Sequence, residues 1–324
     1  MNILVTGAAG YVGSICAEQL AQKKHRVVGY DNLSAGHRQA LAPGVRFVQG
    51  EVADAERLKR VFKKYGIEAV MHFAASIEAG ESMTNPHFFY RNNVSATIAL
   101  FEAMLQCGIR KLVFSSSAAV YGEPQRIPIP EEHPTCPINC YGETKLVIER
   151  ALGWYHRAHG LNSVALRYFN AAGASERLGE DHRPETHLVP RLLEAALNAR
   201  APFQIYGDDY PTPDGTCIRD YVHIRDIAQA HILALRALPR MPFQIYNVGH
   251  GRGYSIREVI RAVEEVTGRK LDVRIGPRRP GDPAVLVASP RKISKELKWK
   301  PRFSDLRSIV GSAWAWKQKH PQGY

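Results

Sequence analysis

The chain has 324 residues, 45% of them hydrophobic, which is enough for one large or two modest domains with an apolar core. Its formal charge of +12 comes from 43 basic and 31 acidic residues, but the basic clusters are short and interrupted, which argues against a nucleic-acid partner. No apolar run is long enough to span a bilayer, and the first residues predict a strand rather than a signal peptide.

Strand-like apolar runs alternate with amphipathic stretches through the first half of the chain. The predicted strands cover residues 3–6, 27–30, 45–49, 69–73, 112–115 and 164–168, and the predicted helices cover 12–22, 56–65, 93–107 and 144–159. This alternation predicts a doubly wound α/β domain, a Rossmann fold, in which helices cover both faces of a parallel sheet.

After about residue 170 the composition changes, because Gly, Pro and Asp cluster in residues 172–184 and 206–215. We interpret these clusters as loops around a site. Further predicted elements are helices over 188–199, 225–238 and 255–267 and a strand over 244–248. We therefore expect a first unit over residues 1–170 and a smaller α/β unit over 171–324, with a segment near 220–250 that crosses back to the first sheet.

A glycine-rich loop joins the first predicted strand to the first predicted helix. Gly7, Gly10 and Gly13 stand where a tight turn must let the backbone approach a pyrophosphate at a helix N-terminus. The second strand ends at Asp31, 18 residues after Gly13, close to the position of a ribose-binding acid. A carboxylate there accepts ribose hydroxyls and repels a 2′-phosphate, so the sequence predicts NAD rather than NADP.

Tyr141 and Lys145 stand four residues apart in the helix predicted next after the fifth strand. Helical spacing of four places the phenol and the ammonium on one face. A nearby cation favours the phenolate, which is the form that a tyrosine base requires near neutral pH. The pair alone is weak support for catalysis, because this spacing also occurs by chance.

Cysteine usage points to a reducing, cytoplasmic setting. The five cysteines are odd in number and scattered, at Cys16, Cys107, Cys136, Cys140 and Cys217. No second Cys or His pair near Cys136 and Cys140 completes a set of four zinc ligands. The sequence therefore predicts no metal site.

Several motifs together resemble one known family. These are the glycine loop, Ser115-Ser116-Ser117 placed after the fifth strand, Tyr141-x-x-x-Lys145, and the stretches 114–122, 166–170, 215–223 and 320–324. The chain resembles the UDP-glucose 4-epimerases of the extended short-chain dehydrogenase/reductase family from end to end. The resemblance implies tightly bound NAD, a UDP-sugar substrate and a homodimer formed by the helices near 93–107 and 144–159.

The resemblance also implies a mechanism and a set of site residues. Tyr141 is expected to remove the proton of the sugar 4-hydroxyl, Lys145 to bind the nicotinamide ribose and lower the tyrosine pKa, and Ser117 to hold the reacting oxygen. C4 inverts through a transient 4-keto sugar that turns in the pocket. Cofactor contacts are expected from Gly7, Gly10, Tyr11, Val12, Gly13, Asp31, Asn32, Leu33, Ser34, Ala35, Gly36, Glu51, Val52, Phe73, Ala74, Ala75, Asn92, Ser117, Tyr141, Lys145 and Phe169. Substrate contacts are expected from Ser117, Tyr141, Asn170, His187, Arg219, Arg279, Asp282 and Leu286.

Three positions depart from the family pattern. Glu51 replaces the usual Asp near the adenine, and Ile77 replaces the Lys of one branch, so we expect altered contacts rather than lost binding of NAD. Leu286 stands where large residues exclude N-acetylated sugars and small residues admit them. Leucine is intermediate, so UDP-glucose and UDP-galactose are the expected main pair, with some turnover of UDP-N-acetylhexosamine.

The same motifs bear on other activities of related enzymes. A 4,6-dehydratase needs acidic residues beside the serine, and Ser116-Ser117-Ala118-Ala119 supplies none. A 4-epimerase of UDP-glucuronate or a UDP-pentose needs the same Tyr and Lys and stays open on the sequence. A non-catalytic NAD or UDP-sugar sensor is disfavoured because the Ser, Tyr and Lys are all present.

Overall fold

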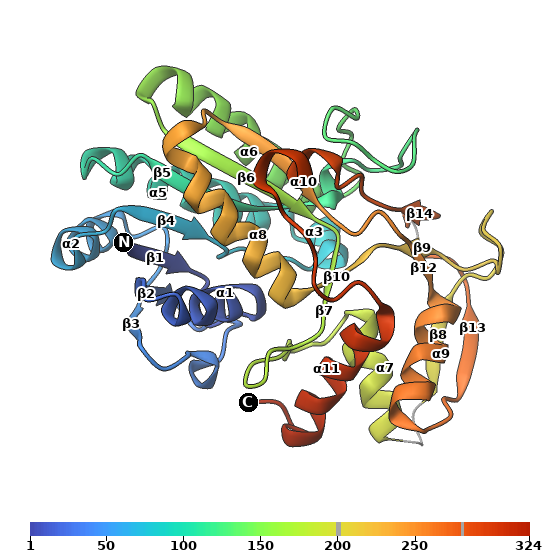
Figure 1. The fold of residues 1–324 in the computed structure, drawn as a ribbon. Helices are drawn as coiled ribbons and strands as arrows, with labels where there is room; N and C mark the ends of the chain where they lie inside the picture. Colours follow the sequence, from blue (N-terminus) through green and yellow to red (C-terminus); the bar gives the residue numbers. More distant parts are fainter. Residues whose placement is uncertain (199–201, 280–281) are drawn as a thin grey trace.

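A seven-stranded parallel sheet is the centre of the molecule, which a computed structural model describes over residues 1–198, 202–279 and 282–324 (Figure 1). The strand order is β11-β6-β5-β4-β1-β2-β3, and all neighbours run parallel. The strands are β1 (Asn2–Thr6), β2 (Arg26–Asp31), β3 (Val45–Gln49), β4 (Ala69–His72), β5 (Lys111–Ser117), β6 (Asn162–Tyr168) and β11 (Gln244–Val248). The order reverses between β1 and β4, and such a reversal opens a crevice at the carboxyl ends of the strands.

Helices cover both faces of the sheet because alternate strand residues bury apolar side chains on opposite sides. In β1, Ile3 and Val5 face one core and Leu4 faces the other. The first face carries α1 (Tyr11–Gln22), α8 (Ile224–Ala237) and α10 (Arg291–Leu297). The opposite face carries α2 (Ala55–Tyr65), α5 (Ala96–Gln106) and α6 (Cys140–His159).

A third apolar core lies beyond the carboxyl edge of the sheet. It is formed by α7 (Leu188–Leu197), α9 (Ile256–Thr267) and α11 (Leu306–Lys319), which Figure 1 shows grouped away from the large sheet. The remaining strands are short: β7 (Asn170–Ala172), β8 (Phe203–Tyr206), β9 (Ile218–Arg219), β10 (Tyr221–His223), β12 (Tyr254–Ser255), β13 (Val273–Gly276) and β14 (Val285–Leu286). Residues of the C-terminal half nevertheless supply β11, α8 and α10 to the large sheet and its first face.

The predicted fold class is confirmed, and so is each predicted strand to within two residues at its start. One boundary was wrong where it affects the site, because β5 continues to Ser117 and the three serines lie on the strand rather than after it. The helix predicted over 93–107 is a π-helix over Tyr90–Ser95 followed by α5. Residue 199, the predicted end of the helix after 188, lies outside the described residues.

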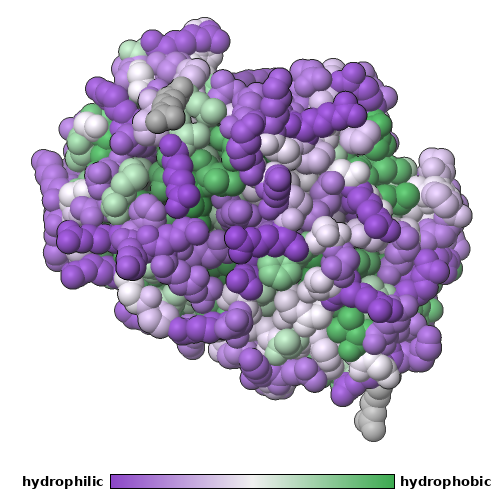
Figure 2. Space-filling view, viewed as in Figure 1, coloured by the Kyte–Doolittle hydropathy of each residue, from purple (hydrophilic) through white to green (hydrophobic). Residues whose placement is uncertain are grey.

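Several elements were not predicted. They include short or polar helices, namely α3 (Ala79–Thr84), α4 (Pro86–Phe89), α10 and α11, with 3-10 turns at η1 (Arg38–Ala40), η3 (Ala118–Val120) and η4 (Leu238–Arg240). Among the described residues, no helix is both long enough and apolar enough to cross a bilayer. Hydrophilic side chains cover most of the face shown in Figure 2, with apolar side chains in separate small groups.

Candidate active site

The glycine loop has no room for side chains at two of its three glycines. Gly7 has a left-handed φ of +67°, and a Cβ there would lie 2.6 Å from the Ala74 nitrogen. A Cβ on Gly13 would lie 2.1 Å from the Gly7 oxygen. Gly10 is the N-cap of α1, so the unpaired N–H groups of the first turn are not covered by a capping side chain. This cradle fits a dinucleotide pyrophosphate.

Asp31 ties the end of β2 to the glycine loop. Its Oδ2 accepts from the Ala9 N–H at 3.0 Å and its Oδ1 from the Leu33 N–H at 2.8 Å, with the side chain buried. Each carboxylate oxygen keeps a lone pair for a ribose hydroxyl. Beyond it, Asn32 donates to both oxygens of Glu51, at 3.2 and 3.1 Å. These two residues line a hollow together with Gln49, Gly50, Asp54 and Arg57.

The other expected cofactor residues gather around this loop. The segment Leu33–Gly36 folds against it, because a Cβ on Gly36 would lie 2.8 Å from the Ala9 side chain. Asn92, in the π-helix, donates to Ser76 Oγ at 2.9 Å just beyond Phe73–Ala75. The remaining ones lie in or beside the same region: Tyr11 and Val12 open α1, Val52 follows Glu51, and Phe169 follows β6.

The carboxyl end of β5 and the start of α6 bring the expected catalytic side chains together. Asn139 caps α6 by accepting from the Gly142 N–H at 2.8 Å. A Cβ on Gly142 would lie 2.5 Å from the Ala119 oxygen, so only glycine allows α6 to begin this close to η3. Lys145 lies one helical turn after Tyr141, with Nζ 5.7 Å from the tyrosine ring centroid.

The three consecutive serines of β5 have different partners. Ser115 Oγ pairs with the Tyr168 hydroxyl at 2.6 Å, and Ser116 Oγ donates to buried Glu149 at 2.5 Å. Ser117 Oγ accepts from the Ala119 N–H at 3.1 Å. Ser117 also interacts with the Tyr141 hydroxyl and lowers the tyrosine pKa. Of the three serines, Ser117 therefore lies where it can hold a reacting oxygen.

The surroundings of Tyr141 in the protein raise its pKa, and the expected lowering by Lys145 stays a prediction. Burial raises the pKa of Tyr141, the charges of Tyr168 and Glu78 raise it further, and Ser117 only partly offsets them. Burial also lowers the pKa of Lys145 to about 7, against the influence of Glu149. The Lys145 ammonium is only 3% exposed and donates to the Ser115 carbonyl at 2.8 Å.

The two arginines expected to bind the substrate lie in the C-terminal half, and each contacts a side chain from another segment. Arg219 in β9 is 9% exposed and forms an ion pair with Asp282, while its Nη1 donates to the Ile218 carbonyl at 2.9 Å. The Arg279 guanidinium lies 4.0 Å from the centroid of the Tyr206 ring. Arg219 is thus already paired with a carboxylate, so a diphosphate would have to share this pair.

Leu286 and Asn170 lie next to this basic region. Leu286 pairs with Arg219 in the ladder of β14 and β9, and its side chain packs on the apolar cluster that contains Phe169. The Asn170 N–H donates to the Asp220 carbonyl at 2.9 Å. Leu286 and Phe169 thus link the expected sugar side of the site to the expected nicotinamide side.

His187 belongs to a cluster that the sequence analysis missed. Glu180, His182, Glu185 and His187 lie in the segment before α7, and their ligand-type atoms are all within 4.8 Å of one another. Burial lowers the pKa of His182, but the nearby carboxylates of Glu180 and Glu185 outweigh it and raise the pKa to about 9. The alternation of Glu and His within eight residues was a readable signal, which a search limited to cysteine pairs did not find.

Comparisons with known proteins agree with this geometry. The sequence profile of the NAD dependent epimerase/dehydratase family matches residues 3–249. A UDP-glucose 4-epimerase of Lacticaseibacillus casei is 48% identical over 100% of this chain and 99% of its own length. A crystal structure of a UDP-glucose 4-epimerase superposes with a TM-score of 0.97 at 46% identity, covering 100% of this chain and 99% of the other. The structure of UDP-glucose 4-epimerase from Brucella ovis in complex with NAD superposes with a TM-score of 0.94 at 46% identity, and the match covers 97% of each chain.

Proposed function

The chain belongs to the NAD dependent epimerase/dehydratase family, and we infer from its site that it is an NAD-dependent isomerase that interconverts UDP-glucose and UDP-galactose by inverting C4. The observation that carries this inference is that Tyr141, Lys145 and Ser117 meet at the carboxyl end of β5, on the same edge of the sheet as the glycine loop after β1. A relative named UDP-glucose 4-epimerase matches the chain over its full length.

Residues of the first unit are proposed to hold the cofactor. The glycine cradle fits a pyrophosphate, Asp31 fits the adenosine ribose, and Lys145 fits the nicotinamide ribose. NAD held by these residues would supply the acceptor and donor of the C4 hydride and a positive charge close to Tyr141. Since the hydride returns to the same sugar, the cofactor stays bound through each turnover.

Tyr141 is proposed to move the proton of the 4-hydroxyl group. Its phenol lies near Ser117, which is positioned to hold the same oxygen while the proton leaves. Tyr141 takes the proton as C4 becomes the carbonyl of the 4-keto sugar, and returns it after the sugar has turned in the pocket. The phenol must therefore be ionised before each forward step, which is why its burial requires a compensating positive charge.

The second unit is proposed to bind the UDP-sugar. Arg219 and Arg279 offer planar guanidinium groups that suit a diphosphate, and Asp282 holds Arg219 in place. Asn170, His187 and Leu286 are proposed to contact the rest of the nucleotide sugar. We accordingly propose that residues 1–170 bind NAD and residues 171–324 bind the substrate, apart from the segment that returns to the sheet.

A homodimer formed through α5 and α6 is part of the proposal. Large apolar side chains are exposed near these helices: Trp154 of α6 is 66% exposed, and Met83 of α3, Phe88 of α4 and Tyr90 of the π-helix are 61%, 41% and 41% exposed. A second copy of the chain would cover such side chains. All five cysteines are free, in keeping with the proposed cytoplasmic location.

The test is to incubate purified protein with UDP-galactose, without added reductant, and to follow UDP-glucose by NMR. We expect a mixture of both sugars and no accumulation of reduced cofactor. Formation of a dehydrated sugar, or no change in the presence of bound NAD, would contradict the proposal. Parallel incubations with UDP-N-acetylglucosamine, UDP-glucuronate and UDP-xylose decide whether another UDP-sugar is the better substrate.

A further inference from the structure

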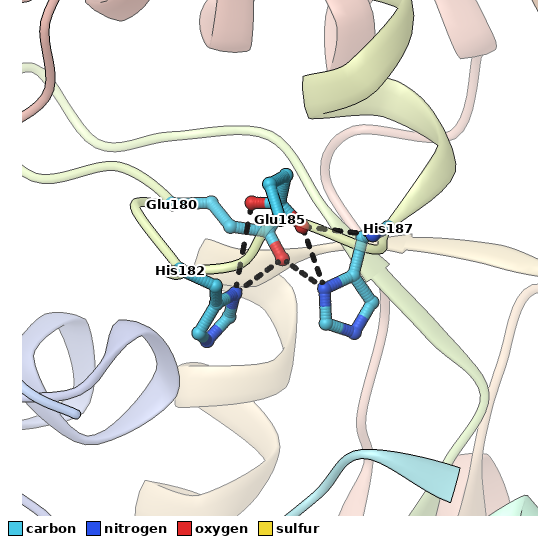
Figure 3. Close-up of side chains that lie close together, drawn as sticks. All are labelled: Glu180, His182, Glu185 and His187. Carbon is cyan, nitrogen blue, oxygen red and sulfur yellow. Dashed lines mark hydrogen bonds and ion pairs between the residues drawn. The ribbon is translucent and has the colours of Figure 1, made fainter. Parts of the chain in front are cut away.

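Four side chains that can act as metal ligands meet in one loop, apart from Tyr141, Lys145 and Ser117. Figure 3 shows His182 and His187 with a ring nitrogen of each turned toward the carboxylates of Glu180 and Glu185. The nitrogen is Nδ1 in both rings, and the four N···O separations are 3.3, 3.8, 3.0 and 3.1 Å. Both glutamate side chains are only 7% exposed.

These separations match a tetrahedral site. Zinc binds imidazole nitrogen and carboxylate oxygen at about 2.0–2.2 Å, which places tetrahedral ligand atoms about 3.4 Å apart. The four N···O separations fall on either side of that value. His182 Nδ1 is buried, and among the described residues it has no hydrogen-bond partner of acceptable geometry. This nitrogen therefore faces two carboxylates without a well-formed hydrogen bond to either.

We propose that Glu180, His182, Glu185 and His187 bind one divalent transition metal ion, with zinc the best fit. Two imidazoles and two carboxylates form a neutral set with a dication, and mixed N/O ligands suit zinc. Four protein ligands leave no open position, so the ion is structural rather than catalytic. All four ligands come from residues 180–187, which form a single chelating loop.

The loop holds several parts of the molecule together. The His182 ring lies edge-on to Tyr11 of the glycine loop, with centroids 6.3 Å apart. Asp181 accepts from the Tyr324 N–H at 3.0 Å, and Thr186 Oγ1 donates to Glu78 at 2.9 Å. A bound ion would fix this loop beside Tyr11. Slower loss of NAD from the metal-bound protein is therefore expected, and this consequence rests on the proposed function, whereas metal binding itself does not.

The alternative is a set of ion pairs between protonated histidines and glutamates. A cysteine at position 182 separates the two, because a thiolate is a good zinc ligand and a poor replacement for an imidazolium. His182→Cys should keep the metal and, with cobalt in place of zinc, add a sulfur-to-metal charge-transfer band. If the cluster is only a set of ion pairs, neither the wild-type protein nor His182→Cys should bind the metal.

The experiment uses the full-length protein without an affinity tag. Elemental analysis after dialysis against zinc should give one ion per chain for wild type and His182→Cys, and none for His182→Gln or Glu185→Gln. Cobalt-loaded wild type should show the intense visible bands of tetrahedral coordination. His37→Gln is the matched control, since His37 pairs with Asp181 in the same loop but outside the cluster, and it should keep the zinc.

Two results would overturn the proposal. One is wild-type protein that retains no zinc, and the other is equal zinc content in wild type and His182→Gln. The retention role is tested separately by the rate at which bound NAD dissociates, measured by its absorbance after filtration. If zinc-free and zinc-loaded wild type release NAD at the same rate, that role fails while the site stands. UDP-galactose turnover is not needed for either measurement.

Discussion

At the scale of single residues, Tyr141 carries the clearest expectation for activity. Replacing it with Phe removes the group proposed to take the 4-hydroxyl proton while keeping the ring that contacts Lys145. We expect Tyr141→Phe to lose about 10²–10⁴ in kcat, the range of general acid–base catalysis, and to retain NAD. The measurement is UDP-galactose turnover at saturating substrate together with the content of bound cofactor.

The matched control is Tyr168→Phe. Tyr168 is another phenol near Tyr141 and is paired with Ser115 at 2.6 Å, so its loss changes polarity near the site without removing the proposed base. We expect it to keep most of its activity. If both variants lose kcat to the same extent, Tyr141 contributes through the polarity of the site rather than as the base.

Leu286 is the residue expected to decide between plain and N-acetylated sugars. Its side chain packs on the apolar cluster that contains Phe169, at the end of a two-residue strand. Leu286→Ala enlarges this position and should raise the kcat/KM ratio of UDP-N-acetylglucosamine to UDP-glucose about 10-fold or more, the scale of small steric changes in a pocket. Leu286→Tyr should lower the ratio. Val285→Ala, whose side chain faces the other side of the strand, is the control, and an unchanged ratio in all variants would contradict the assignment.

At the scale of elements, Asp220 joins three segments around the substrate side. Its carboxylate accepts from the backbone N–H groups of His250, Gly251 and Ala288, at 2.9, 3.0 and 3.2 Å. Asp220→Asn places an amide NH₂ against at least one of these donors. We expect the free energy of unfolding to fall by about 1–3 kcal/mol, the cost of leaving a buried donor unpaired. Urea unfolding followed by tryptophan fluorescence measures it, with Asp208→Asn on the exposed loop as control.

How far the sequence predicted each element depended on where its stability comes from. Strands such as β1 and β6 were predictable because each is a short, nearly continuous apolar run buried on both faces, and α1 was predictable because it is a long apolar stretch between them. The π-helix over Tyr90–Ser95 was not, because its wider turn serves the contact of Asn93 with Ser76 and Thr144, at 3.0 and 3.1 Å. Pairings between distant segments leave no local pattern.

In the candidate site, too, features with a local sequence pattern could be predicted and features that depend on distant segments could not. The glycines and the Tyr141–Lys145 spacing were readable because their chemistry is local to one turn or one helix. The pairing of Arg219 with Asp282 and the upward shift of the Tyr141 pKa were not, since each depends on burial and on partners far away in the chain. The meeting of Glu180 with His187 was readable as spacing, but its closeness follows from how the loop folds.

At the scale of the whole molecule, three buried histidines contribute to a loss of stability in acid. Burial lowers the pKa of His72 to about 3, of His223 to about 3 and of His231 to about 4, with the charge of Lys145 adding to the effect at His72 and those of Arg225 and His250 at His223. An unfolded histidine titrates near pH ~6.5. All three are neutral in both states above that pH, so their contribution to stability is fully present there. As the pH falls from about 6.5 toward 4, these histidines become protonated in the unfolded chain but stay neutral in the folded chain. The free energy of unfolding therefore decreases.

Replacing His231 isolates one of these protons. His231 is fully buried, packs against Phe73 with centroids 4.6 Å apart and bonds the Ile227 carbonyl at 2.9 Å. Phe preserves the ring contact and cannot be protonated, so His231→Phe should reduce the pH slope of the free energy of unfolding by about 1.4 kcal/mol per pH unit, which corresponds to one proton. Urea titrations between pH 7.5 and 4.5 give this slope. His87→Asn, at an exposed position of α4, should leave the slope unchanged, and a slope in His231→Phe equal to that of wild type would mean that the acid response has another source.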